Sequence, residues 1–242
     1  MNYAVNADQV LAGLTAATDR LLAGAASLSD GQAREPSLLP GWTRGHVLSH
    51  LARNAEGGTR LLTWARTGIP SYEYESLEAR AAAIEAGAGR PAQILTEDVR
   101  RTAAAFAGAA ADMPPAAWQR VVRYTGGQEP CAEVIVPSRL AEVLIHHVDL
   151  DIGFGPLDWP TSFVADSLPL VTGELGQRAG MTAMRVAGTD TGRELTIGSV
   201  SPAAVTVSGR EAELLAWLLG RSGGQALTCE PDGPLPGIPA FY

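Results

Sequence analysis

The sequence contains no lysine, two cysteines and four histidines among its 242 residues. Cys131 and Cys229 are far apart and form no CxxC pair, so the sequence favours neither a disulfide framework nor a zinc site built from cysteines. All 18 basic residues are arginines, and the 26 acidic residues outnumber them, which gives a formal net charge of −8. Nucleic-acid binding usually needs a clustered basic face. We therefore expect no nucleic-acid partner and look to small molecules or protein.

Long hydrophobic runs are also absent. No stretch of about 18 or more uncharged apolar residues occurs, as a membrane-spanning helix would need. The N-terminal segment carries Asp8 and has no basic start followed by an apolar run, so it does not match a secretory signal. We predict a cytoplasmic protein with no membrane partner. The hydrophobic content of 46% is enough for one substantial core or two modest ones.

The first half of the chain shows the periodicity of long amphipathic helices. Apolar residues recur at helical spacing over residues 6–26, and Thr43 is a suitable N-cap for a second helix that runs to about Arg66. The connection 67–90 is too long for a simple turn, contains a short helical run, and is typical of a lid or binding loop. Pro91 is well placed as the first residue of a third helix.

A different pattern follows the third helix. Two short β-rich runs between Trp118 and Val136 predict a hairpin or an extended excursion, and a fourth helix is expected over 139–152. After Pro156 the sequence predicts a helix, three short strands, another helix and a proline-rich tail. We therefore expect the fold class α+β, with an N-terminal four-helix bundle over residues 1–155 and a small C-terminal α+β domain over residues 156–242.

The four histidines fall in two pairs, His46/His50 and His146/His147. Glu142 precedes His146 by four residues, and residues four apart project from the same face of a helix. With His50 from another helix they would make a His₂Glu set, which is the ligand set of a catalytic zinc or similar divalent metal that keeps one position open. A metal would also remove the cost of a carboxylate placed among apolar residues.

Other assignments compete with this set. By spacing alone, His46 could replace His50 as a ligand or join it as a fourth, but it is also the third helical residue after a cap at Thr43, and we favour that interpretation. His147 points about 100° away from His146 and is expected to pack elsewhere. Asp149 and Asn54 are within reach as partners that hold an imidazole in its ligating tautomer, and each could equally be a solvated polar residue. The absence of an HExxH motif argues against a zinc-peptidase arrangement.

Four segments resemble the mycothiol-dependent maleylpyruvate isomerase family, within the DinB-like metal-binding four-helix proteins. They are LLPGWTRGHVLSHLARNAEG, EARAAAIEAG, SRLAEVLIHHVDL and VTVSGREAELLAWLLGR, and the similarity extends over nearly the whole chain. The resemblance implies that His50, Glu142 and His146 bind zinc, and His46 matches no family ligand. It further implies that Arg80 and Arg221 line the active site and meet anionic groups, although from the sequence alone both would be surface arginines. It assigns no residue to the binding of the thiol cofactor.

The chemistry implied by this resemblance suits these residue types. Guanidinium groups recognise the carboxylates of a dicarboxylate such as maleylpyruvate, and a zinc with an open position lowers the pKa of a bound thiol, here mycothiol. The expected reaction is thiolate addition to the cis double bond, rotation, and elimination to fumarylpyruvate, a step of aromatic catabolism through gentisate. No protein nucleophile is required, so we expect Cys131 and Cys229 to be buried small hydrophobes.

Two alternative functions remain at this point. The same ligands could activate mycothiol for transfer to another electrophile, which would make the protein a mycothiol S-transferase. A metal-binding stress protein without turnover is the other alternative. Paired anion-binding arginines far apart in the sequence argue against it, because a metal sensor has no need of them.

Overall fold

The computed structural model describes residues 7–201 and 204–239. The chain divides into two compact units, one that extends to Gly153 and one that begins at Phe154. This division lies close to the expected boundary at 155, and the proposal that the two parts are separate domains rests on the sequence. The expected start of the first helix at Asn6 lies outside the described residues.

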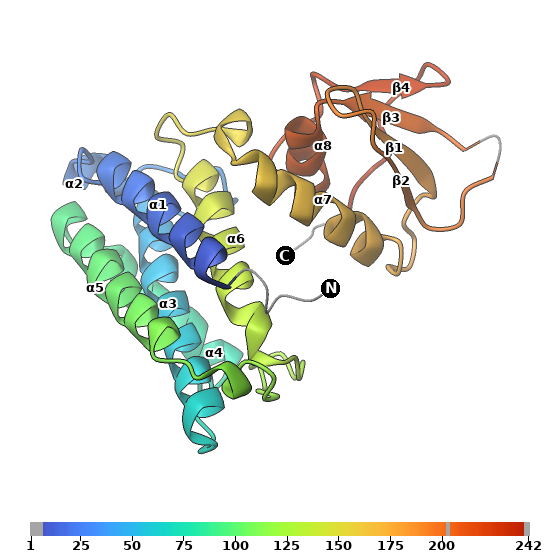
Figure 1. Ribbon diagram of the computed structural model, residues 1–242. Coiled ribbons are helices and arrows are strands. Elements are labelled where there is room, and N and C mark those ends of the chain that lie inside the picture. The colour runs from blue at the N-terminus through green and yellow to red at the C-terminus, as the bar shows by residue number, and fades with distance from the viewer. Residues whose placement is uncertain (1–6, 202–203, 240–242) are drawn as a thin grey trace. The chain divides into compact units, whose positions relative to one another are not determined.

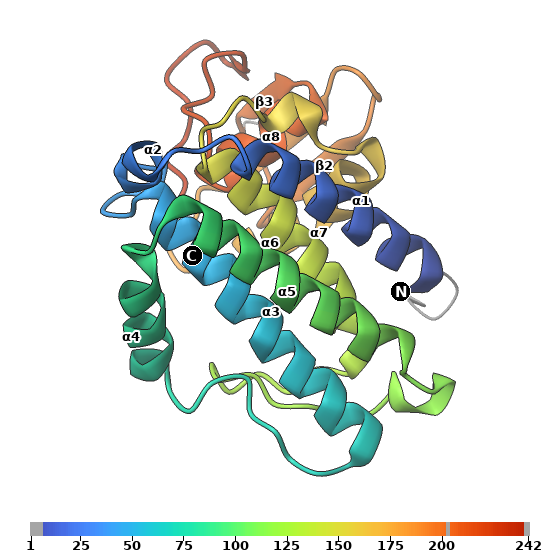
Figure 2. The same ribbon diagram turned by 90° about the vertical axis from the view of Figure 1, so that its left-hand side faces the viewer.

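The first unit consists of helices (Figure 2). Its long helices are α1 (Ala7–Ala25), α3 (Arg44–Thr67), α5 (Ala92–Ala111) and α6 (Ile135–Asp149), and shorter α2 (Asp30–Arg34) and α4 (Leu77–Ala88) lie in the connections. α3 packs against α4, α5 and α6, while α1 packs against α5 and α6. The four long helices therefore form the bundle that the periodicity predicted, whereas α2 was not predicted.

The core of the bundle is built around the apolar face of α3. Its fully buried apolar side chains are those of Val47, Leu48, Leu51, Leu61 and Leu62. Each such side chain contributes about 1.5–3 kcal/mol when it is removed from water. The helix begins at the predicted cap, where the Thr43 hydroxyl accepts a hydrogen bond from the His46 backbone N–H.

The beginning of α3 is joined to the end of α6 by hydrogen bonds to backbone carbonyls. Arg44 Nε donates to the carbonyl oxygen of Leu150 at 2.7 Å, and Arg44 Nη2 donates to that of Asp151 at 3.3 Å. The Leu38 backbone N–H donates to the Asp149 carbonyl at 2.9 Å. These contacts satisfy carbonyls that a helix end leaves unpaired. They also fix the spacing of the two helices near the functional residues described below.

The segment before α6 is the clearest departure from the sequence prediction. Val121 and Cys131 form an isolated antiparallel bridge, so part of the expected hairpin is present without a full strand. The expected strand at 132–136 is wrong, because these residues form the short 3-10 helix η3 (Ala132–Val134) and the start of α6. Pro137 lies in the first turn of α6, where its missing N–H needs no partner. α6 therefore begins before residue 139 and ends at Asp149 instead of 152.

The second unit combines two helices with a four-stranded sheet (Figure 1). Its elements are α7 (Thr161–Leu175), β1 (Met184–Gly188), β2 (Glu194–Ile197), β3 (Thr206–Gly209), α8 (Glu211–Leu218) and β4 (Thr228–Glu230). The strand order is β2-β1-β3-β4, with β1 and β3 parallel and the other pairs antiparallel. The α+β fold class is confirmed. The strand β4 was not predicted, since it lies in the proline-rich tail.

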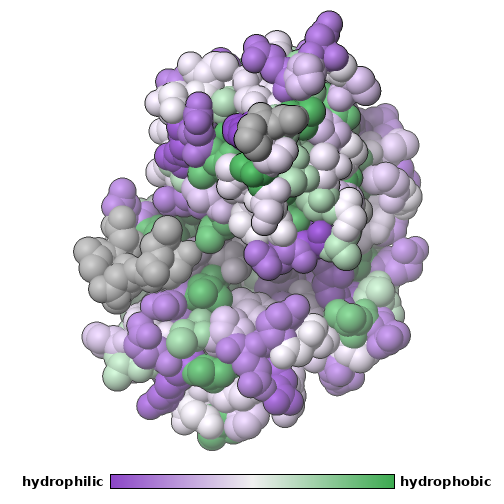
Figure 3. Space-filling model, turned by 90° about the vertical axis from the view of Figure 1, so that its right-hand side faces the viewer, coloured by the Kyte–Doolittle hydropathy of each residue, from purple (hydrophilic) through white to green (hydrophobic). Residues whose placement is uncertain are grey.

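None of the described helices is long and apolar enough to cross a membrane. On the face shown in Figure 3, hydrophobic residues are scattered among hydrophilic ones instead of forming one broad patch. The cytoplasmic location expected from the sequence stays a prediction.

Candidate metal centre

Two helices of the bundle bring three ligand-type side chains to one point. α3 supplies His50, and α6 supplies Glu142 and His146 from adjacent turns of one face. His50 Nε2 lies 2.8 Å from Glu142 Oε2 and 3.0 Å from His146 Nε2, and His146 Nε2 lies 3.3 Å from Glu142 Oε2. The set inferred from helical spacing therefore converges in space.

The two histidines are removed from bulk water, whereas the side chain of Glu142 is 23% exposed. His50 is 2% exposed and His146 8% exposed. Burial lowers the pKa of His50 to about 4, so that its imidazole is neutral at pH 7. Burial alone would raise the pKa of Glu142, but the adjacent His50 and His146 hold it well below its usual value. At neutral pH the centre therefore offers one carboxylate and a neutral His50, as a divalent metal requires.

Asp149 orients His146. Asp149 Oδ2 lies 2.7 Å from His146 Nδ1, and an ionised carboxylate can only accept a hydrogen bond, so Nδ1 carries a proton and donates it. Burial alone would lower the pKa of His146, but the hydrogen bonds to Asp149 and Glu142 raise it. In the neutral imidazole the lone pair is then on Nε2, which faces the other two ligands. This is the carboxylate–histidine arrangement common at metal sites, and it is the first of the two alternatives that the sequence left open for Asp149.

Arg80 of α4 donates a hydrogen bond to Nδ1 of His50, the ring nitrogen that faces away from Glu142 and His146. Its Nη2 lies 3.1 Å from His50 Nδ1. Because a guanidinium has only donors, Nδ1 must accept, and a neutral His50 then carries its proton on Nε2. In this arrangement Nε2–H of His50 donates to Glu142. A metal bound at Nε2 would need the other tautomer, so His50 and Arg80 must separate before His50 can act as a ligand.

The donor set fits a divalent metal. One ligand atom from each of His50, Glu142 and His146 can be chosen so that all lie within 4.8 Å of one another. Two imidazoles and one carboxylate suit zinc, and three protein ligands leave a coordination position for water or another molecule. Such a centre could activate a thiol or polarise a carbonyl oxygen.

The structure also places the other histidines. His46 Nδ1 accepts a hydrogen bond from the Thr43 backbone N–H at 3.2 Å, and His46 Nε2 contacts Glu85 at 3.0 Å, so the cap interpretation is confirmed. His147 is buried, and its Nε2 lies beside Gly24 of α1, away from the three ligands. Asn54 does not hold the His50 imidazole in its ligating tautomer, which was one of the two alternatives for it. Asn54 Oδ1 accepts from Arg139 Nη1 at 2.8 Å, and His50 Nδ1 pairs with Arg80 instead.

Arg221 and the two cysteines are the remaining residues with an expectation from the sequence. Arg221 follows α8 in the second unit, and its Nη1 donates to the Leu219 carbonyl at 2.8 Å. Its expected place in the site therefore stays a proposal. Cys131 and Cys229 are both free thiols of intermediate exposure, so the expectation that they are buried is wrong.

Two aromatic residues of the centre were not singled out from the sequence. The Trp42 ring centre lies 5.7 Å from that of His50 and 6.1 Å from that of His46. The Arg80 guanidinium carbon lies 5.8 Å from the Tyr74 ring centre. Trp42 could have been noticed as the residue before the N-cap of α3, whereas Tyr74 lies in a connection without periodicity.

Tyr74 brings an unused hydroxyl to this region. Its Oη is buried and donates no hydrogen bond among the described residues, and Arg80, which has only donors, can donate to it. Burial and the nearby Glu73 raise the pKa of Tyr74 to about 12, so the hydroxyl keeps its proton at neutral pH. It is therefore available as a donor to a bound molecule.

Comparisons with known proteins give one match to a family model and two matches in fold. The model of the mycothiol maleylpyruvate isomerase N-terminal domain matches residues 14–151, which is more than half of the chain. Two solved structures superpose with a TM-score of 0.90, at 24% identity and covering 97% of each chain. One is a mycothiol-dependent maleylpyruvate isomerase, and the other is a histidine-to-alanine mutant of that enzyme. No curated protein matches the chain.

Proposed function

Since the chain belongs to the family of the mycothiol maleylpyruvate isomerase N-terminal domain, we propose that it is a zinc- and mycothiol-dependent isomerase that converts maleylpyruvate to fumarylpyruvate. The observation that carries this proposal is the convergence of His50, Glu142 and His146 beside the guanidinium of Arg80. A protein that only binds a metal would need the three ligands but not the arginine. The arginine adds a group that recognises carboxylates, as the proposed substrate requires.

Zinc is the metal that we propose for the three ligands. When bound, it would lower the pKa of a thiol at its open position, so that mycothiol is present as the thiolate at neutral pH. The protein contributes the orientation of the ligands. Asp149 holds His146 with Nε2 directed at the centre, and Glu142 supplies the negative charge that offsets a cation.

The reaction that we propose balances without a protein nucleophile. The thiolate forms a C–S bond with one carbon of the cis double bond, and the electron pair moves to the adjacent carbonyl group as an enolate. Rotation about the former double bond follows. The electron pair then returns, the C–S bond breaks, and the trans product and the thiolate are released. No net proton transfer or oxidation is needed.

Arg80 and Tyr74 suit the charges that develop in this sequence. Arg80 carries a permanent positive charge and, once it leaves His50, its donors can bind a carboxylate or the enolate oxygen. Tyr74 Oη can donate a further hydrogen bond, because it is protonated and its O–H has no acceptor among the described residues. Arg221, from the second unit, is proposed to bind the other carboxylate of the substrate.

The test is an assay of the zinc-loaded full chain with mycothiol and maleylpyruvate, in which product formation is followed by absorbance. Parallel reactions contain a bimane electrophile. Isomerisation that requires both zinc and mycothiol would support the proposal. Conjugation of bimane without isomerisation would replace it with a mycothiol S-transferase, and zinc binding with neither activity would leave a metal-binding stress protein.

A further inference from the structure

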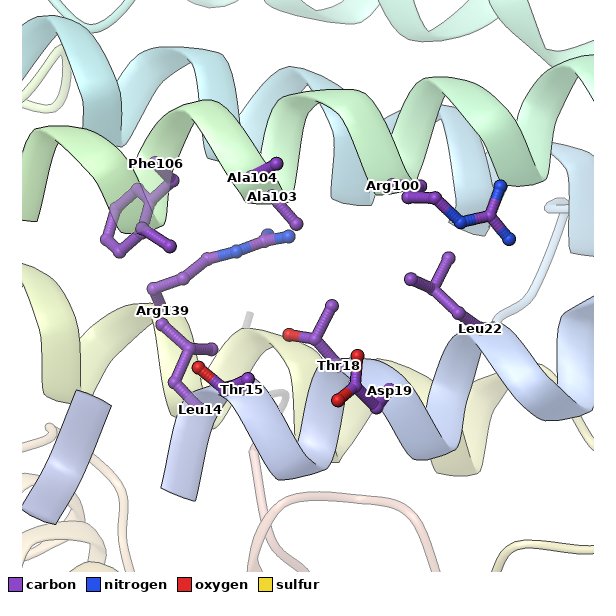
Figure 4. A pocket seen from close by; sticks show the side chains of 11 residues that line it. Leu14, Thr15, Thr18, Asp19, Leu22, Arg100, Ala103, Ala104, Phe106 and Arg139 are labelled. Atoms are coloured by element: carbon purple, nitrogen blue, oxygen red, sulfur yellow. The ribbon is translucent and has the colours of Figure 1, made fainter. Parts of the chain in front are cut away.

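A cavity lies within the first unit, between α1, α5 and α6 (Figure 4). Its volume is about 220 Å³. Apolar side chains form most of its wall, including Leu14 and Leu22 of α1 and Phe106 of α5. None of its lining residues is a ligand of the candidate metal centre. We call it the Arg139 cavity, after the charged residue that reaches into it.

Arg139 is a buried cation without a full set of partners. It is 3% exposed, and Figure 4 shows its side chain extending from α6 into the space between α1 and α5. Its Nη1 donates to Asn54 Oδ1 at 2.8 Å, whereas its Nη2 is buried and has no hydrogen-bond partner. Within the described part of the chain, no carboxylate oxygen lies within 4.0 Å of its guanidinium nitrogens.

A buried guanidinium with one hydrogen bond and no ion pair among the described residues is energetically unfavourable. A buried charge costs several kcal/mol unless it is paired and hydrogen-bonded. Burial lowers the pKa of Arg139 to about 10, and the charge of Glu142, one turn along α6, partly opposes this effect. Arg139 is therefore still charged at neutral pH. Glu142 cannot neutralise it fully, because Glu142 also contacts His50 and His146.

The lining of the cavity indicates what kind of anion would compensate this charge. The apolar wall favours a hydrocarbon body over a hydrated inorganic ion, since a hydrated ion would have to give up its water. The cavity contains one buried cation, which suits a single negative charge. Asp19 and Arg100 are exposed residues of opposite charge at its rim, so the rim adds no net charge.

We propose that the Arg139 cavity binds a monocarboxylate with a small hydrocarbon body, whose carboxylate pairs with the Arg139 guanidinium. The hydrocarbon part lies against Leu14, Leu22 and Phe106. Binding there is independent of the isomerase reaction, because it uses neither the metal ligands nor Arg80.

The test is calorimetric titration of the zinc-loaded full chain with hexanoate and, separately, with hexanamide. The two probes have similar size and differ in charge. Wild-type protein is expected to bind hexanoate about 10-fold or more tightly than hexanamide, the range of a hydrogen bond to a charged group. In Arg139→Met this preference should disappear, and the zinc content should be unchanged.

A second variant makes the test independent of Arg139. Ala103→Leu adds bulk to the wall on α5 without changing any charge, and it should weaken the binding of both probes. Hexanoate binding that persists in both variants would show that the carboxylate binds elsewhere, the metal included, and would overturn the proposal. Absence of hexanoate binding to the wild type would overturn it as well.

Discussion

Replacing Arg80 with alanine is expected to strengthen zinc binding, although Arg80 belongs to the proposed active site. Arg80 Nη2 lies 3.1 Å from His50 Nδ1 and stabilises the tautomer that carries its proton on Nε2. Zinc needs the lone pair of Nε2, so its binding must break this hydrogen bond. In Arg80→Ala there is no such bond to break, and the zinc ion also meets one positive charge less.

The size of the effect follows from the bond that is lost. A hydrogen bond that involves a charged group contributes about 1.5–3 kcal/mol, and about 1.4 kcal/mol corresponds to a tenfold change in affinity. Released Arg80 regains part of this energy by hydrogen bonding to water. We therefore expect the Kd for zinc to fall by about tenfold in Arg80→Ala. Isomerase activity should fall at the same time, because the proposed carboxylate contact is removed.

Competition with a chromophoric chelator at pH 7 measures the zinc affinity of the metal-free proteins. Arg123→Ala is the matched control, since it removes the same charge from an exposed arginine that pairs with Glu129, and its Kd should equal that of the wild type. A general loss of structure would weaken both zinc binding and activity. Zinc affinity that is unchanged or weaker in Arg80→Ala would refute the tautomer argument.

Four further variants test the remaining assignments. Asp149→Asn should weaken zinc binding by about 10- to 100-fold without unfolding the protein, as the same chelator competition would show. Glu142→Ala should lose both zinc and activity in elemental analysis and turnover assays, and a metal-replete, active variant would contradict the ligand assignment. Tyr74→Phe should keep most of its thermal stability, because the hydroxyl donates no hydrogen bond among the described residues, but should lower kcat for maleylpyruvate. Asp98 is 8% exposed. Burial alone would raise its pKa, but hydrogen bonds from arginines lower it below the value of an unfolded chain. Its ionised form therefore stabilises the fold fully at neutral pH, and this stabilisation is lost as the pH falls below about 3.8. Urea unfolding should show that Asp98→Asn is less stable at pH 7 by about 1–3 kcal/mol and that this difference shrinks in acid.

The metal ligands were predictable because helical geometry is local. Glu142 and His146 share a helix face whatever the rest of the fold does. Of the pair His46/His50, His46 was assigned to the helix cap, so His50 was left as the third ligand. The partners of these residues were harder to predict, since they come from elements distant in sequence. Asn54 is four residues from His50, yet Arg139 from another helix competes for it.

The strand prediction for the segment before α6 was wrong for a related reason. Apart from Glu133, residues 132–136 are apolar, and they are rich in β-branched residues, a composition that favours strands when no other information is present. In the protein this segment starts a helix whose buried face packs against α1 and α3, so tertiary packing overrides the local preference. The short strand β4 was missed for the opposite reason, because three residues are too few to show a period.

The contacts of Arg44 with the Leu150 and Asp151 carbonyls bear on how the protein matures. They join the two histidine-bearing helices without the help of a metal ion, so we expect the polypeptide to fold in a metal-poor environment. Zinc could then be acquired late and surrendered again to a chelator without denaturing the chain. The holoenzyme level in a cell would thus follow zinc supply, while the amount of folded polypeptide would not.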